Sequence, residues 1–419
     1  MASKEYVIES DFIPQNLIKT SILLKHKKPN YIEDFLKPFL EFLPDDLTKE
    51  FRLPVKIREN ERNKYNPLLR LAKPEEASII ANIVKDDYEG TYPYKEMENP
   101  IEIQRMIETG DYKFILFLDD KGTIMGSTCF VLDFPKKKGY LRSLVVKKEF
   151  IGYLDTTKAY ITACLMIWCK YRDKILIWWG EARTADSKSQ YINRLCAVRP
   201  IAWLPNKDIF YNKIESDLMM IAYSRDVIKK YRTKKIPKII RSIIQCYTFA
   251  DSQYKLGEYI VENPSIKLNS KKLKNLNREI KITQKSDKNG YIKFKMTFKN
   301  TRSFFNFLYT PRVKNFEKTE YKVNNLEELF VYIHNFLKLA SKLNVRYIEA
   351  HVSAYVPSHQ KLFVYFNMKP RGYIPSWKNE KHNLDFKDYI LVNHYSNKLF
   401  NKIQLIPEAR LLINELDLS

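Results

Sequence analysis

The sequence predicts an α/β protein built from two copies of one supersecondary unit. Shifting residues 147–205 forward by 170 positions, without a gap, brings Gln190 onto Gln360, Pro200 onto Pro370 and Pro205 onto Pro375. Shortly after each copy, an acidic residue opens an apolar strand pattern, Asp217 in one and Asp388 in the other. A content of 45% hydrophobic and 14% aromatic residues in a chain of 419 is enough for two or three folded domains.

The first elements are expected to be helical, followed by a strand and two helices. Residues 1–66 contain short apolar pieces broken by prolines, such as 31–42, and predict a helical N-terminal extension. Residues 69–72 have the pattern of a strand. A helix then opens at Lys73-Pro74-Glu75-Glu76 and runs towards Val84, because proline and acids favour the first turn of a helix. A second helix is predicted over 100–108.

A three-stranded segment and a long helix are predicted next. The strand patterns cover 112–118, 124–133 and 140–146, and a turn signal, Asp119-Asp120-Lys121-Gly122, joins the first two. The helix expected over 155–171 is apolar nearly all round, so it should be covered on more than one side.

The first unit is expected to close with a strand over 174–179, a helix and a last strand ending at Tyr223, so that it spans 67–225. Residues 226–285 are basic and predicted to form a helical bridge. The turn signal 286–290 opens a strand over 291–298, and the second unit runs through 286–419.

Cysteine usage and hydropathy exclude some classes of protein. The five cysteines are odd in number and scattered in apolar surroundings, which argues against a disulfide framework and a zinc site. The longest apolar stretch, 159–169, is too short to span a membrane, and Met1–Glu5 lacks the apolar core of a secretion signal. A cytoplasmic location without membrane attachment is expected.

The net charge of +23 is concentrated in two segments, 229–241 and 267–285. Nucleic acid, an acidic protein or an anionic cofactor would each be attracted to such segments. Solvated basic helix faces in a lysine-rich sequence would give the same composition. Charge alone names no partner.

The order of the predicted elements over 68–225 resembles the GNAT superfamily of acyl-coenzyme A-dependent N-acetyltransferases. The residues that carry the resemblance are Arg70–Glu76, Gly126-Ser127, Leu144–Gly152 and Pro200–Tyr223. The resemblance implies a mixed, mostly antiparallel sheet flanked by helices in the first unit. The second unit shows a weaker, degenerate form of it. The resemblance also implies acetyl-coenzyme A as co-substrate and an amine acceptor, either a small molecule or a protein.

The implied coenzyme site is the turn between the strand ending at Val146 and the helix from Asp155. Free backbone amides at a helix N-terminus stabilise a diphosphate. Members of the family usually have the motif Q/RxxGxG/A in this turn, whereas residues 149–154 keep only Gly152. The side chain of Asp155, as a helix cap, would compete with a diphosphate for the same amides. The residues implied for the coenzyme are Leu144, Val145, Val146, Lys147, Lys148, Phe150, Ile151, Gly152, Tyr153, Leu154, Asp155, Thr156 and Thr157.

Acetyl transfer needs a base for the acceptor amine and a proton donor for the leaving thiolate. The resemblance implies Glu181 as the base and Tyr191 as the donor, although the family's tyrosine position falls nearer Asn193. Glu181 would equally fit an ion pair with Arg183, and Tyr191 would fit simple packing.

The loop before the second helix corresponds to the region that encloses the acceptor in GNAT enzymes. The resemblance therefore implies that Tyr92 and Tyr94 bind the substrate. Two tyrosines at this place would also fit a role in covering the core.

The second unit lacks the implied equipment. At the same offset Gly152 becomes Lys322, Glu181 becomes His351 and Tyr191 becomes Lys361. His351 and His359 lie eight residues apart without further ligands, so no metal site is expected and both are interpreted as structural.

Three functions stay open. The first is an N-acetyltransferase with a catalytic first unit and a structural or substrate-binding second unit. The second is a non-catalytic pseudo-acetyltransferase that binds nucleic acid or an acidic protein through its basic bridge. The third is an acetyltransferase whose protein or RNA substrate is recruited by the basic surface.

Overall fold

The computed structural model describes residues 29–43, 46, 49–54, 65–299, 301–379, 384–396, 398–399 and 403–416. They divide into two compact units. Unit 1 contains the described residues up to Pro200 together with 210–212 and 219–227. Unit 2 contains 201–209, 213–218 and the described residues from Ile228 onwards.

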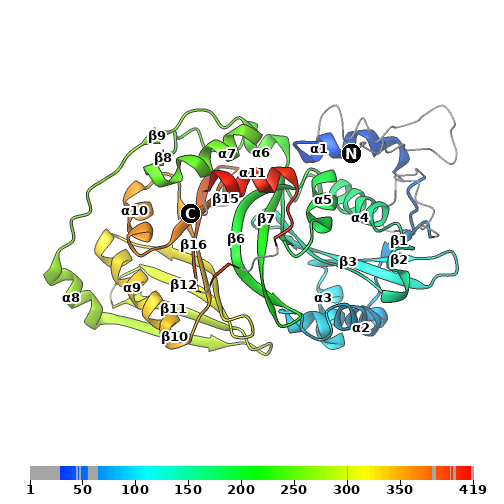
Figure 1. Cartoon of the computed structure of the whole chain (residues 1–419), viewed down its shortest axis with the longest axis horizontal. Helices are drawn as coiled ribbons and strands as arrows, with labels where there is room; N and C mark the ends of the chain where they lie inside the picture. The colour runs from blue at the N-terminus through cyan, green and yellow to red at the C-terminus, as the bar shows by residue number, and fades with distance from the viewer. Residues whose placement is uncertain are drawn as a thin grey trace. The chain divides into compact units, whose positions relative to one another are not determined.

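Unit 1 is a sheet with helices on both faces (Figure 1). Its strands lie in the order β1-β2-β3-β4-β5-β7, and β4 and β5 are the parallel neighbours. The elements are α1 (Ile32–Leu36), β1 (Leu68–Leu71), α2 (Ala77–Asp87), α3 (Pro100–Thr109), β2 (Tyr112–Leu118), β3 (Ile124–Asp133), β4 (Lys138–Val146), α4 (Thr156–Tyr171), β5 (Ile177–Arg183), α5 (Lys188–Leu195), the end of β7 (Lys213–Tyr223) and the start of α6 (Arg225–Lys229).

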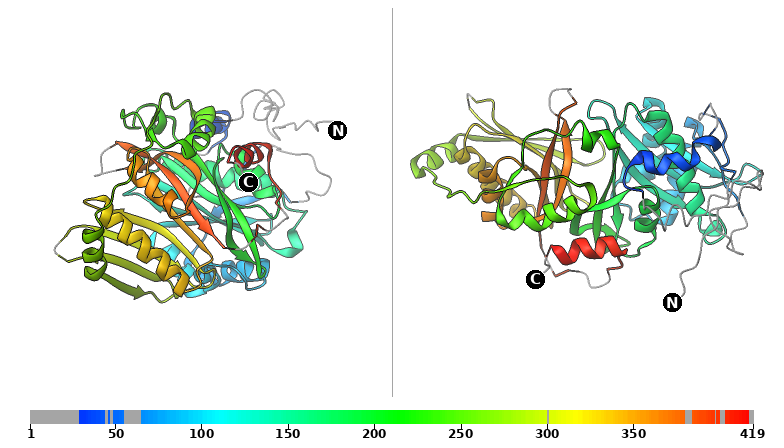
Figure 2. Two further views of the ribbon diagram at one scale, coloured as in Figure 1. Left: turned by 60° about the vertical axis from the view of Figure 1, so that its left-hand side comes forward. Right: turned by 90° about the horizontal axis from the view of Figure 1, so that it is seen from above.

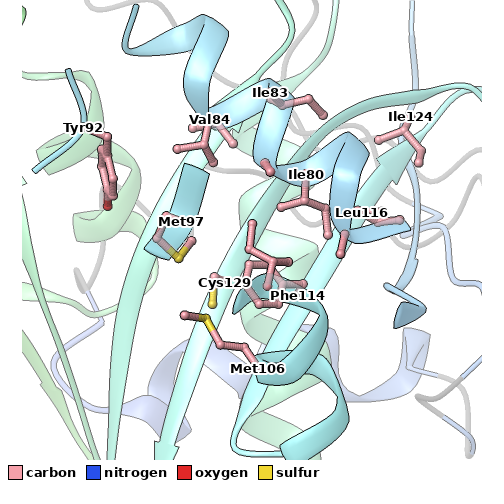
Figure 3. Packing of buried hydrophobic residues seen from close by; sticks show 14 of the residues in the cluster. Ile80, Ile83, Val84, Tyr92, Met97, Met106, Phe114, Leu116, Ile124 and Cys129 are labelled. Carbon is pink, nitrogen blue, oxygen red and sulfur yellow. The ribbon is translucent and has the colours of Figure 1, made fainter. Parts of the chain in front are cut away.

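Two helices of unit 1 pack on one face of its sheet. Ile80 of α2 and Met106 of α3 share a buried cluster with Phe114 and Leu116 of β2 and Cys129 of β3 (Figure 3). The strand β2 is apolar and buried from Phe114 to Leu118, and Phe114, Leu116 and Leu118 at every second position share the face that α2 and α3 cover. Burial of these side chains away from water holds α2 and α3 on the sheet.

The long helix α4 covers the opposite face and is itself covered. Trp168 of α4 stacks on Trp178 of β5 with 5.9 Å between ring centroids. Phe35 of α1 meets the same Trp168 edge-on at 5.4 Å. The expectation that this helix is buried on more than one side is confirmed.

Unit 2 contains most of β6 and a second set of strands, in the order β6-β15-β16-β14-β13-β12-β11-β10. The long helix α9 lies against β11, β12 and β13 (Figure 2), where Phe336 contacts Phe305, Phe307 and Phe316. Its elements are β6 (Arg199–Phe210), β8 (Lys238–Ile239), α7 (Ile244–Tyr254), β9 (Ile260–Val261), α8 (Ser270–Glu279), β10 (Ile280–Ser286), β11 (Ile292–Phe298), β12 (Phe304–Thr310), β13 (Asn315–Lys322), α9 (Leu326–Lys342), β14 (Tyr347–Ser353), α10 (Pro357–Tyr365), β15 (Lys369–Asn379), β16 (Phe386–Tyr395) and α11 (Pro407–Glu415).

The two sets of strands follow the same order. Numbered from its own first strand, each set runs 1-2-3-4-5-7-6, as β1-β2-β3-β4-β5-β7-β6 and as β10-β11-β12-β13-β14-β16-β15. Most neighbours in both sets are antiparallel. The predicted fold class, mixed and mostly antiparallel sheets flanked by helices, is confirmed.

Local contacts also recur at the offset of 170 residues. Asp155 caps α4 by accepting from the amide of Lys158 at 2.9 Å, and Asn325 caps α9 by accepting from the amide of Glu328 at 3.0 Å. The two buried glutamines behave alike. Gln190 donates to the carbonyl of Arg183 at 3.0 Å, and Gln360 donates to the carbonyl of Ser353 at 3.0 Å. Residues that match at this offset therefore make equivalent hydrogen bonds in the two units.

The predicted bridge is less helical than its composition suggested. Residues 226–285 form α6, α7 and α8, interrupted by the short parallel strands β8 and β9 and continued by β10 from Ile280. Pro237, Gly257 and Pro264 stand at the interruptions, where proline and glycine end helices. The predicted helical bridge is therefore present as three helices separated by extended segments, with strand β10 at its far end.

Two further expectations concern element boundaries and the N-terminus. The strand expected over 174–179 lies at Ile177–Arg183, because residues 172–174 still belong to the turn after α4. The helical pieces expected over 31–42 are present as α1 and the 3₁₀ helix Lys37–Phe42. The rest of the predicted N-terminal extension lies largely outside the described residues.

Membrane-crossing length is not reached by any helix in the described part of the chain. All five cysteines are free thiols, four of them buried. Burial raises the pKa of Cys246 to about 12, so this thiol stays protonated at neutral pH.

Candidate functional site

The parallel strands β4 and β5 of unit 1 separate before either ends. Their pairing covers Lys138–Leu141 on β4 and Ile177–Gly180 on β5. Beyond these residues β4 runs on to Val146 and β5 to Arg183. The edge of β4 that faces β5 is therefore left without ladder hydrogen bonds from β5 over its last residues, and it can pair with the amide groups of a ligand.

A β-bulge lies in β4 directly after the point of separation. Thr128 pairs with Leu144 and Cys129 with Arg142, so Ser143 is the extra residue, and its φ of 39° is in the left-handed region. A bulge re-aims side chains and is frequent beside functional sites. Here it marks where β4 changes course.

Arg142, just before the bulge, is held by two groups from the loop between α2 and α3. Its guanidinium forms an ion pair with Glu96, and both side chains are about nine-tenths buried. The same guanidinium lies 5.4 Å from the ring centroid of Tyr94. The pair fixes this loop against the sheet, because separating two buried charges from each other is costly.

The turn after β4 differs from the expectation of free amides. The Asp155 carboxylate accepts from the amide of Lys158, and the amide of Thr156 donates to the carbonyl of Leu154 at 2.8 Å. The amide of Asp155 donates to the carbonyl of Tyr65 at 3.4 Å, while the amide of Tyr65 donates to Tyr153 at 3.2 Å. Several amides that were expected to meet a diphosphate therefore already have partners inside the chain.

A cavity of about 420 Å³ lies on the α2 side of the same turn. Three coenzyme residues implied by the sequence line it, namely Val146, Lys147 and Lys148. Its other lining residues are Ile79, Asn82, Ile83, Asp86, Asp87 and Glu149. Three carboxylates and two ammonium groups thus share the lining with Ile79, Ile83 and Val146, an arrangement suited to a ligand with charged groups.

Burial changes the acidity of one cavity carboxylate. Burial raises the pKa of the Asp87 carboxyl above its usual range, and Arg183 and Lys148 counter part of that rise. A carboxyl group with a raised pKa in a cavity is a candidate for proton transfer. Sequence reasoning missed Asp87, because nothing in the pattern of α2 distinguishes it from a solvated last-turn residue.

Glu181 lies on β5 where that strand has left β4. Trp178 packs on α4, and side chains alternate along a strand, so Trp179, Glu181 and Arg183 point to the face of α2 and α3. Glu181 is half-buried. The guanidinium of Arg183 lies 4.4 Å from the ring centroid of Phe210 and 5.9 Å from that of Tyr88. Glu181 and the cavity are thus on the same face of the sheet.

Tyr191, the expected proton donor, lies at the surface, whereas another tyrosine contacts the neighbouring Asn193. Tyr191 of α5 is 36% exposed. At the neighbouring position, Asn193 accepts a hydrogen bond from the hydroxyl of Tyr160 of α4 at 2.8 Å. Burial raises the pKa of Tyr160 well above its usual range, so this hydroxyl keeps its proton. The structure therefore places the hydroxyl of a second tyrosine, which the sequence did not single out, against Asn193 of α5.

The two tyrosines of the predicted substrate loop have different surroundings. Tyr92 is 6% exposed and belongs to the buried cluster of unit 1 (Figure 3), with its ring centroid 4.6 Å from that of Tyr88. Tyr94 is half-buried beside Arg142. Tyr92 thus contributes to packing, whereas Tyr94 lies at the margin of that cluster.

In unit 2 the parallel strands β13 and β14 also separate, but side chains of the chain itself connect them. Here β13 and β14 pair in parallel only at Asn315–Phe316 and Tyr347–Ile348. Beyond that point the hydroxyl of Thr319 donates to the carbonyl of Glu349 at 2.7 Å. The buried Lys207 also lies 3.1 Å from the Glu349 carboxylate. Side chains of the chain itself thus occupy this separation.

The counterparts of the predicted catalytic residues in unit 2 have structural surroundings. His351, in the place of Glu181, stacks on Trp377 with 5.3 Å between ring centroids. His359 lies 3.3 Å from the hydroxyl of Tyr321, and burial lowers the pKa of His359 to about 4. Both contacts agree with the interpretation of these residues as structural histidines.

Comparison with known proteins gives matches among solved structures. No protein-family model and no curated protein matches the sequence. The ribosomal-protein-S5-alanine acetyltransferase from Vibrio fischeri matches with 13% identity and a TM-score of 0.33, over 42% of this chain and 98% of that chain. A point mutant of the spermidine N-acetyltransferase SpeG from Vibrio cholerae matches with 10% identity and a TM-score of 0.32, over 38% of this chain and 94% of that chain.

A third solved structure matches over a similar part of the chain and at similarly low identity. The dodecameric spermidine N-acetyltransferase from Vibrio cholerae matches with 11% identity and a TM-score of 0.33, over 39% of this chain and 96% of that chain. All three are acetyltransferases. At this level of identity the likeness concerns the fold alone.

Proposed function

We propose that this protein is an acetyl-coenzyme A-dependent N-acetyltransferase in which unit 1 transfers an acetyl group to an amine. The observation that carries the proposal is the separation of β4 from β5 after Leu141 and Gly180, next to a cavity of about 420 Å³. The unpaired edge of Arg142–Val146 offers backbone groups to the amides of the pantetheine arm. In a β-sheet, such an unpaired edge is otherwise a liability.

The charged end of the coenzyme is assigned to the turn after β4. Lys147 and Lys148 line the cavity and would neutralise part of a diphosphate. Gly152 has a φ of +84°, and a Cβ added there would meet nothing within 4 Å, so the backbone is open to close approach. The proposal places the diphosphate beside these residues and keeps the amides of α4 in their present hydrogen bonds.

The proposed chemistry is one acyl transfer. Glu181 removes a proton from the ammonium form of the acceptor, and the freed amine attacks the thioester carbonyl. A C–N bond forms and the C–S bond breaks. The leaving thiolate takes a proton from a tyrosine hydroxyl, for which Tyr191 and Tyr160 are the candidates, and the proton that the acylated nitrogen gives up restores that hydroxyl.

The acceptor is assigned to the α2–α3 face of the sheet beside Glu181, because this carboxylate has to reach the amine and does not line the cavity that holds Lys147 and Lys148. Tyr94 is the candidate substrate-binding residue of the predicted pair, because Tyr92 is nearly fully buried. The acceptor is a small molecule or an exposed amine on a protein.

Unit 2 is proposed to be a duplicate that lost catalysis. The shared strand order and the shared cap and glutamine contacts support a duplication. The separation of β13 and β14 is bridged by Thr319 and bordered by the buried Lys207–Glu349 pair, which leaves unit 2 a structural or substrate-binding role.

Isothermal titration calorimetry with acetyl-coenzyme A tests the proposal. We expect saturable heat and a rise in Tm, because a ligand of the native state stabilises it. Pantetheine serves as the matched ligand control, since it lacks the diphosphate that Lys147 and Lys148 would bind. Absence of both heat and thermal stabilisation at millimolar acetyl-coenzyme A would refute coenzyme binding.

A non-catalytic role is the second candidate, and the Asp155 cap favours it. With the amides of Asp155, Thr156 and Lys158 donating within the chain, α4 lacks a preformed anion site. The chain would then bind nucleic acid or an acidic protein through its basic bridge. However, three bridge cations, Arg232, Lys238 and Lys272, already form ion pairs with carboxylates. Salt-dependent retention on a polyanion that is lost on neutralising Lys229, Lys230, Lys234 and Lys235 would support this role.

A further inference from the structure

The two units differ in what connects their first two strands, and therefore in what covers one face of the sheet. In unit 1, α2 and α3 lie between β1 and β2 in the chain and cover Phe114, Leu116 and Leu118. In unit 2 a tight turn at 287–291 joins β10 directly to β11. Helix α9 covers one face of β11–β13, through Phe305 and Phe307 among others (Figure 2).

Side chains on the opposite face are exposed lysines. Phe294, Met296 and Phe298 of β11 point into the core, so the alternating Lys293, Lys295 and Thr297 point outwards. The register of the strands extends this surface to their neighbours. The open face consists of Lys281, Thr283 and Lys285 of β10, Lys293, Lys295 and Thr297 of β11, Phe304 and Asn306 of β12, and Glu320 and Lys322 of β13. Leu308 and Glu317, which follow Lys293 across the sheet on the same face, are buried and mark its border.

The lysines of the open face lie close to one another. Lys285 stands directly opposite Lys293, and Lys295 stands opposite Thr283, diagonal to both Lys281 and Lys285. Opposite side chains in a sheet are about 5 Å apart at Cβ, and diagonal ones about 7–8 Å. Like charges at these separations repel each other and destabilise the sheet.

No carboxylate relieves this repulsion among the described residues. None of the five lysines forms an ion pair there. The exposed acid of this face, Glu320, lies 3.5 Å from Lys378 of β15, and the buried Glu317 lies 3.9 Å from Lys207. Unpaired like charges are costly in a folded sheet and become favourable when an anion lies across them. Lysines on an edge strand can serve to prevent its pairing with another chain, and this role would need charges on β10 alone, the last strand of the sheet. The lysines, however, continue onto β11 and β13.

We propose that the open face of β10–β13 binds single-stranded nucleic acid. Lysines in neighbouring strands suit successive phosphates of an extended strand, and a half-buried Phe304 between Thr297 and Lys322 offers a ring on which a base can stack. Among the described residues of β10–β13 this face has no helix that would enter a duplex groove. An aromatic side chain between the cations favours nucleic acid over an acidic peptide, which has no bases to stack.

Fluorescence anisotropy with a labelled single-stranded oligouridine of about 20 nucleotides tests this site on the full chain. We expect binding that weakens steeply with salt. The variant K281Q/K285Q/K293Q/K295Q should bind about 10- to 100-fold more weakly near 0.1 M salt, with a salt slope smaller by about 3, since each phosphate contact contributes roughly 0.7 to the slope. Because these lysines are exposed and repel one another, the variant should unfold at the same or a slightly higher denaturant concentration.

A matched variant separates this site from net charge. K229Q/K230Q/K234Q/K235Q removes the same four charges from the basic bridge and should leave affinity within about twofold. Equal loss in both variants would overturn the site, as would unchanged binding in the first. Equal affinity for duplex RNA, or displacement by polyglutamate at equal charge concentration, would overturn the assignment to single-stranded nucleic acid.

Phe304 gives an independent readout. Phe304→Leu keeps an apolar side chain of similar volume and should weaken oligouridine binding about fivefold or more while leaving the salt slope unchanged, because stacking involves no counterion release. Unchanged affinity in this variant would contradict base stacking on the open face.

Discussion

Units 1 and 2 share a strand order and differ in what covers one face of the sheet. In unit 1 the α2–α3 pair covers that face, and β2 presents Phe114, Leu116 and Leu118 to it. In unit 2 a short turn replaces the helix pair, and β11 presents Lys293 and Lys295. The comparison shows that the same strand order is compatible with a covered or an uncovered sheet face, provided that the side chains on the uncovered face are polar. Hydrophobic burial determines the residue type, and topology does not.

The same two units differ at the separation of their parallel strands. In unit 1 the separation after Leu141 adjoins a cavity, whereas in unit 2 Thr319 donates across it to Glu349. A fold can therefore keep the geometry that would admit a ligand and fill it with its own polar side chains. Fold and function are separable for this reason.

The largest predicted effect concerns a buried ion pair in unit 2. Asp388 accepts from Arg232, from the hydroxyl of Tyr373 and from the amide of Ser376. Arg232→Met should lower the free energy of unfolding by about 3–5 kcal/mol, because it leaves a buried carboxylate without its counter-charge. Urea denaturation measures this. The double variant R232M/D388N should recover part of the loss, and failure of the single variant to destabilise would show that Asp388 is solvated.

The second prediction compares the two sheet faces directly. Leu116→Ala should cost about 2–5 kcal/mol, since it opens a cavity beneath α2. Lys295→Ala, on the open face of unit 2, should change stability by less than about 0.5 kcal/mol. Denaturation of both variants under identical conditions checks the contrast. A large loss in K295A would mean that the open face is covered by another part of the chain.

The third prediction concerns the loss of stability at low pH through His359, a buried histidine of unit 2. His359 has a pKa lowered to about 4 by burial, whereas the counterpart in unit 1 is Ser189. Because the folded-state pKa is below the unfolded value of about 6.5, the stabilising contribution is complete above pH 6.5 and is lost as pH falls to 4. The loss should reach about 3 kcal/mol. Denaturation midpoints between pH 7 and pH 4 should fall less steeply in His359→Gln, and parallel curves would contradict this assignment.

The smallest predicted effect concerns the two helix caps. Asp155→Ala and Asn325→Ala should each cost about 1 kcal/mol, because each removes the oxygen that accepts from the third amide of its helix. Asp155→Asn keeps the cap and removes one negative charge beside the proposed diphosphate site. Calorimetry with acetyl-coenzyme A should show tighter binding in D155N than in the native chain, whereas N325D should have no effect on that affinity.

Local sequence patterns predicted the regular elements of unit 1 well. The strands expected over 112–118 and 124–133 match β2 and β3, and the helix expected over 155–171 matches α4 with Asp155 as its cap. Alternation, helical periodicity and cap chemistry depend on neighbours within a few residues, so the sequence contains them. The bridge is helical only in part, because Pro237, Gly257 and Pro264 interrupt a composition that favours helix.

The contents of the candidate site depended on contacts that local patterns do not encode. Arg142 pairs with Glu96 across 46 positions, and Tyr160 reaches Asn193 across 33. The cap of α4 was foreseen as a competitor for a diphosphate, but the backbone of Tyr65 as a second partner of the same turn was not. Such partners come from distant segments that only packing brings together.

By itself the sequence determined the fold class, the echo between the two units and the absence of matching site residues in the second unit, because these reside in composition, periodicity and spacing. The tertiary structure alone decided which sheet face stays open, which amides of the turn after β4 are already bonded, and where the cavity beside Lys147 lies. The physical reason is that burial and hydrogen-bond satisfaction are properties of the assembled chain, settled by residues far apart in sequence.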